Sequence, residues 1–201
     1  QLLEINIFLE FVLSNLWLKP TASAVAVDSS SREALAMSIP VRSIIDLTGM
    51  DIANASLLDE ATATAEAVGL SQRLDKTDSK KIFISSNCNP QTIDLIKTRT
   101  NPFGLELIIG DEKTELTKID EDIICGVLSY PGTLGEINDP SESISQIHKK
   151  NGKAILVCDL LALARLKTPA ELGADIAVGS AQRFGIPMGY GGPHAAFFAT
   201  K

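Results

Sequence analysis

The sequence has few of the residues that build disulfide frameworks and metal centres. Its 201 residues include two histidines and three widely spaced cysteines, Cys88, Cys125 and Cys158, with no Cys-x-x-Cys pair. An odd, scattered set of cysteines excludes a disulfide framework, and so few sulfur and imidazole ligands predict no metal site. Cys125 and Cys158 lie inside apolar runs, so we expect them to be small buried side chains of a protein in a reducing compartment.

Positive charge and long apolar runs are also scarce. The chain has 18 Lys and Arg against 25 Asp and Glu, a net charge of −7, which argues against general binding of nucleic acid or anionic membranes. The most apolar stretch, residues 2–18, is interrupted by Glu4 and Glu10 and is shorter than the roughly 20 apolar residues of a membrane span. It predicts an amphipathic helix that faces a partner or the core, with an interfacial membrane helix as the second choice.

Two parts of the chain differ in pattern. Residues 1–43 combine that helix with a Ser-, Ala- and Val-rich linker bracketed by Pro20 and Pro40, and residues 44–201 follow a regular pattern. With 45% hydrophobic residues the second part can bury a core. The chain starts with Gln1 and runs at full hydrophobicity into Lys201, so we expect a piece of a longer protein.

The regular part alternates short apolar segments with helical ones. A helix over residues 61–74, capped by Ser56 or Asp59, begins the series. Further helices are predicted over residues 91–100, over residues 141–150 and just after Asp159. The predicted strands between them are residues 82–84, 105–109, 123–128, 154–157 and 176–178. Apolar strands separated by helices predict a mainly parallel α/β sheet with helices on both faces.

Polar or small residues follow most of these strands. They occupy residues 85–90, 129–133, Asp159 and residues 179–183. Each segment alone is explained by ordinary loop and cap chemistry. Because the carboxyl ends of parallel strands share one edge of a sheet, and ligands bind there, their coincidence predicts a binding site at that edge.

Six segments of the regular part form one ordered set of motifs. They are DLTGM at 46–50, ANASLLDE at 53–60, NPQTID at 89–94, DLLAL at 159–163, ELGADI at 171–176 and GSAQRFGIPMGYGGPHAAFFAT at 179–200. These segments resemble the glycine decarboxylase P-protein family of the glycine cleavage system, the aminomethyl-transferring glycine dehydrogenases. The resemblance covers residues 45–201, whereas residues 1–43 do not resemble the family. The resemblance implies a fragment of the fold type I, aminotransferase-like large domain of pyridoxal phosphate enzymes.

The resemblance also implies positions equivalent to a cofactor site. Asp159 lies where a carboxylate pairs with the pyridine nitrogen, and it can equally cap the helix that follows. Thr62 lies at the helix start that holds the phosphate. Asn89 lies where the family usually has a histidine that stacks on the ring. Asparagine has no π-face, so this departure weakens a cofactor site here.

The position of the Schiff-base lysine is occupied by Gln182 or Arg183, depending on where one gap is placed. An amide is not nucleophilic and a guanidinium stays protonated, so neither can replace the lysine. The resemblance therefore implies the N-terminal, lysine-free half of a duplicated protein whose catalytic lysine lies in the C-terminal half. The glycine-rich segment with Gly189, Gly191, Gly192 and His194 is then interpreted as a structural or interface element.

The family suggests the function of the complete protein. It implies decarboxylation of glycine with pyridoxal phosphate and transfer of the aminomethyl group to the lipoyl group of H-protein, and this segment is expected to support that site without binding the cofactor. An inert scaffold that only pairs with the catalytic half is the alternative, and residual cofactor binding through Asp159 and Thr62 is a third. The expected location is the bacterial cytoplasm, or the mitochondrion for a eukaryotic protein.

Overall fold

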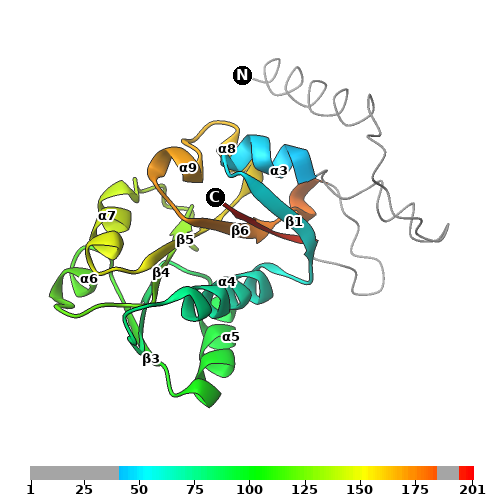
Figure 1. Cartoon of the computed structure of the whole chain (residues 1–201). Helices are drawn as coiled ribbons and strands as arrows, with labels where there is room; N and C mark the ends of the chain where they lie inside the picture. The colour runs from blue at the N-terminus through cyan, green and yellow to red at the C-terminus, as the bar shows by residue number, and fades with distance from the viewer. Residues whose placement is uncertain (1–40, 185–194) are drawn as a thin grey trace.

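A seven-stranded sheet organises the chain (Figure 1). The computed structural model describes residues 41–184 and 195–201. The strands follow the spatial order β1-β7-β6-β5-β4-β2-β3. Their bounds are β1 Ile52–Leu57, β2 Lys81–Ser85, β3 Glu106–Gly110, β4 Cys125–Tyr130, β5 Lys153–Cys158, β6 Ile176–Ser180 and β7 Ala196–Thr200.

The five strands predicted from the sequence are the parallel part of the sheet. β3, β2, β4, β5 and β6 pair in parallel, and β7 pairs antiparallel with both β6 and β1. The prediction of a mainly parallel sheet is thus confirmed. The sequence-based prediction did not include the two strands β1 and β7. The IANASL sequence of β1 combines small and polar residues that have low strand propensity, and alternate β1 residues are exposed.

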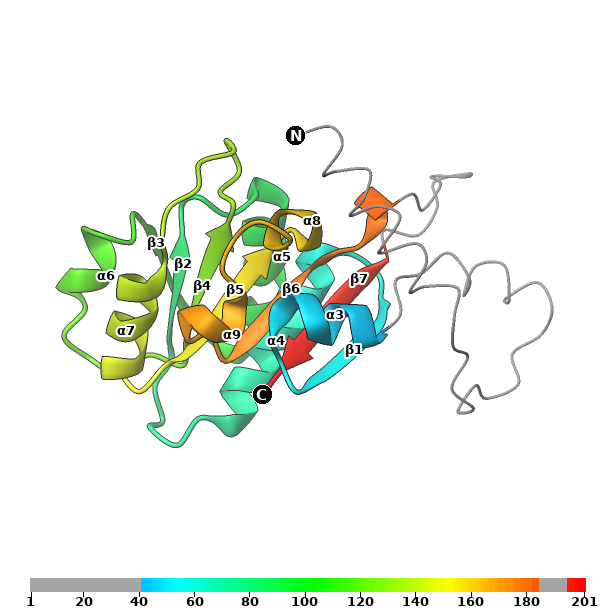
Figure 2. The ribbon, with the colours of Figure 1, turned by 90° about the horizontal axis from the view of Figure 1, so that it is seen from above.

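Helices cover both faces of the sheet, as predicted (Figures 1 and 2). The α4 and α5 helices pack on one face, and the other helices pack on the opposite face. Two short 3-10 helices, η1 Asn101–Phe103 and η2 Gln182–Phe184, follow α5 and β6. The α-helices are α3 Val41–Thr48, α4 Glu60–Leu74, α5 Pro90–Thr100, α6 Glu115–Lys118, α7 Ser141–Lys149, α8 Leu160–Leu163 and α9 Pro169–Leu172.

The alternation of side chains along the strands divides the core into two layers. In β2, Ile82 and Ile84 face the α4 and α5 layer, and Phe83 faces the opposite layer; all three are fully buried. A strand covered on both faces needs apolar residues at every position, which explains the continuous apolar runs in the sequence. Because β2 to β6 run parallel, their carboxyl ends lie at one edge of the sheet.

Small residues let α4 pack closely on the sheet, and a capping residue fixes where the helix begins. Its buried Ala63 and Ala67 bring the helix close to the sheet. Asp59 is its N-cap and accepts a hydrogen bond from the Thr62 backbone N–H at 2.7 Å. Ser56, the other predicted cap, lies within β1 instead.

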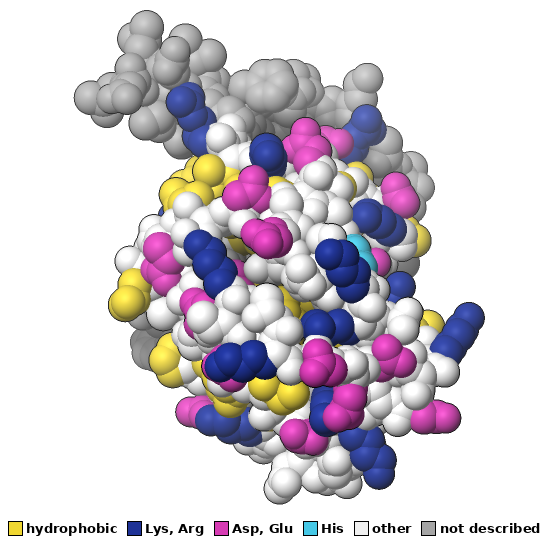
Figure 3. Space-filling model, turned by 90° about the vertical axis from the view of Figure 1, so that its left-hand side faces the viewer, with side chains coloured by type: hydrophobic (Ala, Val, Ile, Leu, Met, Phe, Trp, Pro, Cys, Tyr) yellow, Lys and Arg dark blue, Asp and Glu magenta, His cyan; other side chains and the backbone are white. Residues whose placement is uncertain are grey.

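The charges on the described surface are mixed. On the face seen in Figure 3, lysine, arginine, aspartate and glutamate side chains are interspersed without a continuous basic area. In the part of the chain that the structure describes, no helix has the length and apolar character needed to cross a membrane.

Candidate functional site

A cleft of about 840 Å³ lies at the carboxyl ends of β4, β5 and β6. Figure 2 shows the arrows of β4 and β5 pointing toward this edge, near the start of α8. Its lining comes mainly from the loops after these strands and from the starts of α4 and α5. The lining residues are Glu60, Asn89, Ser129, Pro131, Gly132, Thr133, Gly135, Val157, Cys158, Asp159, Ala162, Ser180, Gln182 and Arg183.

An ion pair joins the ends of two neighbouring strands in this cleft. Asp159 directly follows β5, and Arg183 lies in η2 just after β6. One carboxylate oxygen of Asp159 lies 2.7 Å from Nη1 of Arg183, and the other accepts the backbone N–H of Leu161 at 3.0 Å, which caps α8. Both oxygens of the Asp159 carboxylate are thus engaged within the chain. The side chain of Asp159 is 24% exposed and that of Arg183 is 60% exposed, so the cation forms part of the cleft surface.

Asn89 connects three segments that border the cleft. Its amide nitrogen donates to Oε1 of Glu60 at 2.8 Å, and its amide oxygen accepts from the Thr133 hydroxyl at 2.6 Å. The Thr92 hydroxyl also lies 3.4 Å from the same Glu60 oxygen. This network holds the start of α4, the start of α5 and the loop after β4 together, and it uses both ends of the Asn89 amide.

The start of α4 is acidic. Asp59 accepts the Thr62 N–H and Glu60 occupies the first helical turn, so carboxylates already complement the positive end of this helix dipole. Thr62 is half-buried and is not among the residues that line the cleft. An anionic group placed here would meet two carboxylates.

The strands β5 and β6 pack tightly against each other near the cleft. Gly179 lies in β6, and a Cβ added there would lie 2.1 Å from the carbonyl oxygen of Cys158 and 2.8 Å from Cε1 of Phe197. Glycine therefore permits the close approach of β5 and β6 just before the two strands end.

The cysteines are buried, as predicted for Cys125 and Cys158. Burial raises the pKa of Cys125 to about 12. Burial, with the nearby charges of Glu60 and Asp159, also raises the pKa of Cys158, the thiol that borders the cleft. A thiol with a raised pKa carries little thiolate at neutral pH, so neither Cys125 nor Cys158 has the properties of a nucleophile.

The structure brings four of the five described candidate residues together, and Thr62 is the exception. Asn89, Asp159, Gln182 and Arg183 line one cleft, as the edge argument predicts. Ser85, predicted to follow a strand, is instead the last residue of β2; it is fully buried and donates to Glu112 at 2.6 Å. Gly189, Gly191, Gly192 and His194 lie outside the described residues. Among residues 41–184 and 195–201, no group of three or more acidic, histidine or cysteine side chains could hold a metal ion.

The role of Glu60 was not predicted. A carboxylate in the first turn of a helix is ordinarily explained by the helix dipole, so the sequence offers no separate signal for it. Only the fold places Glu60 within hydrogen-bonding distance of Asn89, a residue 29 positions away.

A family model described as the glycine cleavage system P-protein matches residues 41–201. The chain belongs to this P-protein family. Over 158 residues it is 76% identical to the glycine dehydrogenase (decarboxylating) of Pelagibacter ubique (strain HTCC1062) and 51% identical to that of Rhizobium leguminosarum bv. trifolii (strain WSM2304). Each match covers 79% of this chain and 16% of the relative. The chain therefore spans about one sixth of the length of the curated P-protein relatives it matches.

Solved structures agree with the P-protein assignment and the fold. The crystal structure of an inhibitor-bound glycine decarboxylase (P-protein) matches with a TM-score of 0.74 at 30% identity, covering 97% of this chain and 45% of that one. A putative O-acetylhomoserine (thiol)-lyase from Campylobacter jejuni, solved with a pyridoxyl-lysine monophosphate, matches with a TM-score of 0.61 at 15% identity, covering 91% of this chain and 49% of that one. The sheet is thus the large-domain fold of the fold type I pyridoxal phosphate enzymes, as the resemblance implied.

Proposed function

We propose that this chain is the part of a glycine decarboxylase that supports the active site without carrying the Schiff-base lysine. The observation that carries the proposal is the ion pair of Arg183 with Asp159. Arg183 stands at one of the two candidate lysine positions, and its guanidinium contacts the carboxylate expected to pair with the pyridine nitrogen. In this arrangement the Arg183 guanidinium stands in place of the lysine. It also pairs with the carboxylate that would otherwise pair with the pyridine nitrogen of the cofactor.

The cleft residues do not fit pyridoxal phosphate, for three independent reasons. The Asp159 carboxylate is engaged by Arg183 and by the Leu161 N–H. The start of α4 presents carboxylates where a phosphate would need N–H groups. Asn89 has no aromatic face and its amide is held by Glu60. These contacts argue against residual cofactor binding through Asp159 and Thr62, and no chemical step is assigned to the cofactor here.

In this proposal the catalytic activity belongs to the complete protein and not to this chain alone. It decarboxylates glycine with pyridoxal phosphate and passes the aminomethyl group to the lipoyl group of H-protein. The covalent step takes place in a lysine-bearing half, on the same chain or in a second subunit. Residues 44–201 then form a partial large domain, residues 1–43 an added helix and linker, and the protein acts in the bacterial cytoplasm, in keeping with its bacterial relatives.

Substitution of the two candidate lysine positions tests the proposal. Arg183→Lys and the matched Gln182→Lys each place an amine in the cleft, and we expect both variants to stay colourless with added pyridoxal phosphate. We also expect mass spectrometry to find no borohydride-fixed pyridoxyl group on residues 182 or 183. A yellow variant with such an adduct would show that the cleft accepts the cofactor once the lysine is present, and the conclusion that the cleft residues do not fit pyridoxal phosphate would then be wrong.

A catalytically inert scaffold is the second candidate, and a specific observation favours it. The polar groups of the cleft satisfy one another, since Asp159 pairs with Arg183 and Asn89 with Glu60 and Thr133. Asp159→Asn in the complete protein separates the two functions. A supporting role predicts a lower kcat for glycine-dependent release of carbon dioxide at unchanged assembly. A scaffold role predicts an unchanged kcat once the halves are associated.

A further inference from the structure

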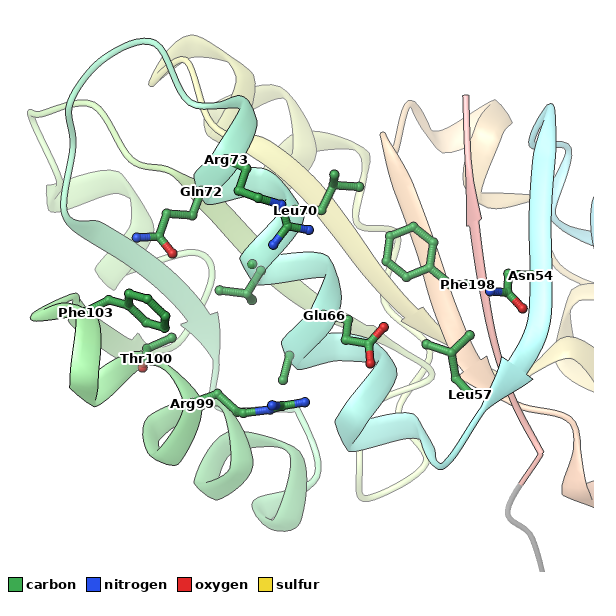
Figure 4. A pocket seen from close by; sticks show the side chains of 13 residues that line it. Asn54, Leu57, Glu66, Leu70, Gln72, Arg73, Arg99, Thr100, Phe103 and Phe198 are labelled. Carbon is green, nitrogen blue, oxygen red and sulfur yellow. The ribbon is translucent and has the colours of Figure 1, made fainter.

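A second hollow lies on the α4 face of the sheet, separate from the cleft. It has a volume of about 810 Å³ and shares no lining residue with the cleft. Figure 4 shows it crossing α4, with Asn54 and Leu57 of the edge strand β1 and Phe198 of the neighbouring β7 at one end and Thr100 and Phe103 at the other. We call this hollow the α4 groove.

Small and apolar residues shape the α4 groove. Gly69 and Ala65 keep the surface of α4 low, and a Cβ added at Gly69 would have only Nη1 of Arg73 within 4 Å, at 3.6 Å. Phe103 at the rim is 65% exposed, an unusual state for a large aromatic side chain. Partly buried Leu70 continues the apolar surface along α4, and partly buried Phe198 adds to it at the end opposite Phe103. This shape suits an extended or helical polypeptide better than an enclosed small molecule.

Three charged residues of the α4 groove have no partner in the described part of the chain. Arg73, Arg99 and Glu66 line the groove and are exposed, and none of the ion pairs among residues 41–184 and 195–201 includes them. Unpaired arginines beside exposed aromatic surface are typical of protein interfaces, where they pair with carboxylates. Glu66 and the net charge of −7 disfavour nucleic acid as the occupant.

We propose that the α4 groove docks an amphipathic, carboxylate-bearing segment of the remaining P-protein polypeptide. This inference depends on the proposed function, because it takes the occupant from the same enzyme. Most of the P-protein polypeptide lies outside this chain and can provide such a segment, since the chain covers 16% of the length of its curated relatives and 45% of the P-protein crystal chain. Carboxylates of the segment pair with Arg73 and Arg99, and its apolar side chains cover Phe103.

Photo-crosslinking tests the occupant directly. The experiment uses the complete P-protein, with the rest supplied on the same chain or as a second subunit, and carries p-benzoylphenylalanine in place of Phe103. We expect irradiation to link position 103 to a P-protein segment outside residues 1–201 that contains Asp or Glu. The same probe in place of Lys113, an exposed residue before α6, is the control and should give little of this product.

Charge reversal tests the arginine pairing. With the probe at position 103, we expect Arg99→Glu to lower the crosslink yield at least about threefold, because a like-charge contact replaces an ion pair. Lys113→Glu changes the net charge equally and should leave the yield unchanged. A yield at position 103 no higher than the control, or crosslinks to nucleic acid or to a second copy of residues 1–201, would overturn the proposal. Glycine-dependent release of carbon dioxide, assayed on the same protein, shows separately whether the proposed function holds.

Discussion

The close packing of β5 and β6 makes a quantitative prediction for Gly179→Ala. The added Cβ would lie 2.1 Å from the Cys158 carbonyl oxygen of the neighbouring strand and 2.8 Å from the fully buried ring of Phe197. Cβ contacts below 3.0 Å essentially do not occur, so β5, β6 or the ring must move. The first obstacle is backbone, which cannot change rotamer to make room.

The magnitude follows from that obstacle. Overpacking a well-packed core typically costs 1–3 kcal/mol, and a backbone obstacle places this variant at the upper end, a loss of about 3 kcal/mol in the free energy of unfolding. Gly179 does not have a positive φ. The backbone preference of alanine would therefore favour the variant slightly, and the predicted loss comes from the contact alone.

Urea unfolding of the chain, followed by circular dichroism, measures the effect. Gly69→Ala is the matched control, because it adds the same methyl group inside α4 with only an ordinary contact to Arg73. Alanine is the better helix former, so the control should gain up to about 1 kcal/mol. The two variants should move the urea midpoint in opposite directions. A Gly179→Ala protein within about 0.5 kcal/mol of the parent would refute the packing argument.

Two further predictions concern titratable groups. Hydrogen bonds from Ser141, with Lys167 nearby, lower the pKa of Asp139 to about 2, so its stabilising contribution is complete above its ordinary pKa near 4 and is lost as the pH falls toward 2. Asp139→Asn should therefore lose less stability than the parent between pH 4 and pH 2 in urea unfolding, and an equal loss would contradict the assignment. Burial raises the pKa of all three thiols, so a thiol reagent at pH 8 should modify them only after unfolding, and rapid labelling of the folded protein would disprove this.

Local signals predicted the elements whose causes are local. Asp59 as a cap and the end of α5 at Thr100, before Asn101 and Pro102, both follow from residue chemistry within one helical turn. The continuous apolar run of β5 is equally visible, because a strand covered on both faces needs no polar position. The strands β1 and β7 were missed, since β1 has little strand propensity and forms only because β7 provides a pairing edge.

The sequence by itself determined the family, the order of the parallel strands along the chain and the absence of lysine from the expected segment. It also placed Asn89, Asp159 and Arg183 at one edge, because parallel strands end together. Only the tertiary structure decided that Arg183 pairs with Asp159 and that Glu60 holds Asn89. These contacts join segments 24 and 29 residues apart, and their distances depend on strand register and helix packing, which no local pattern encodes.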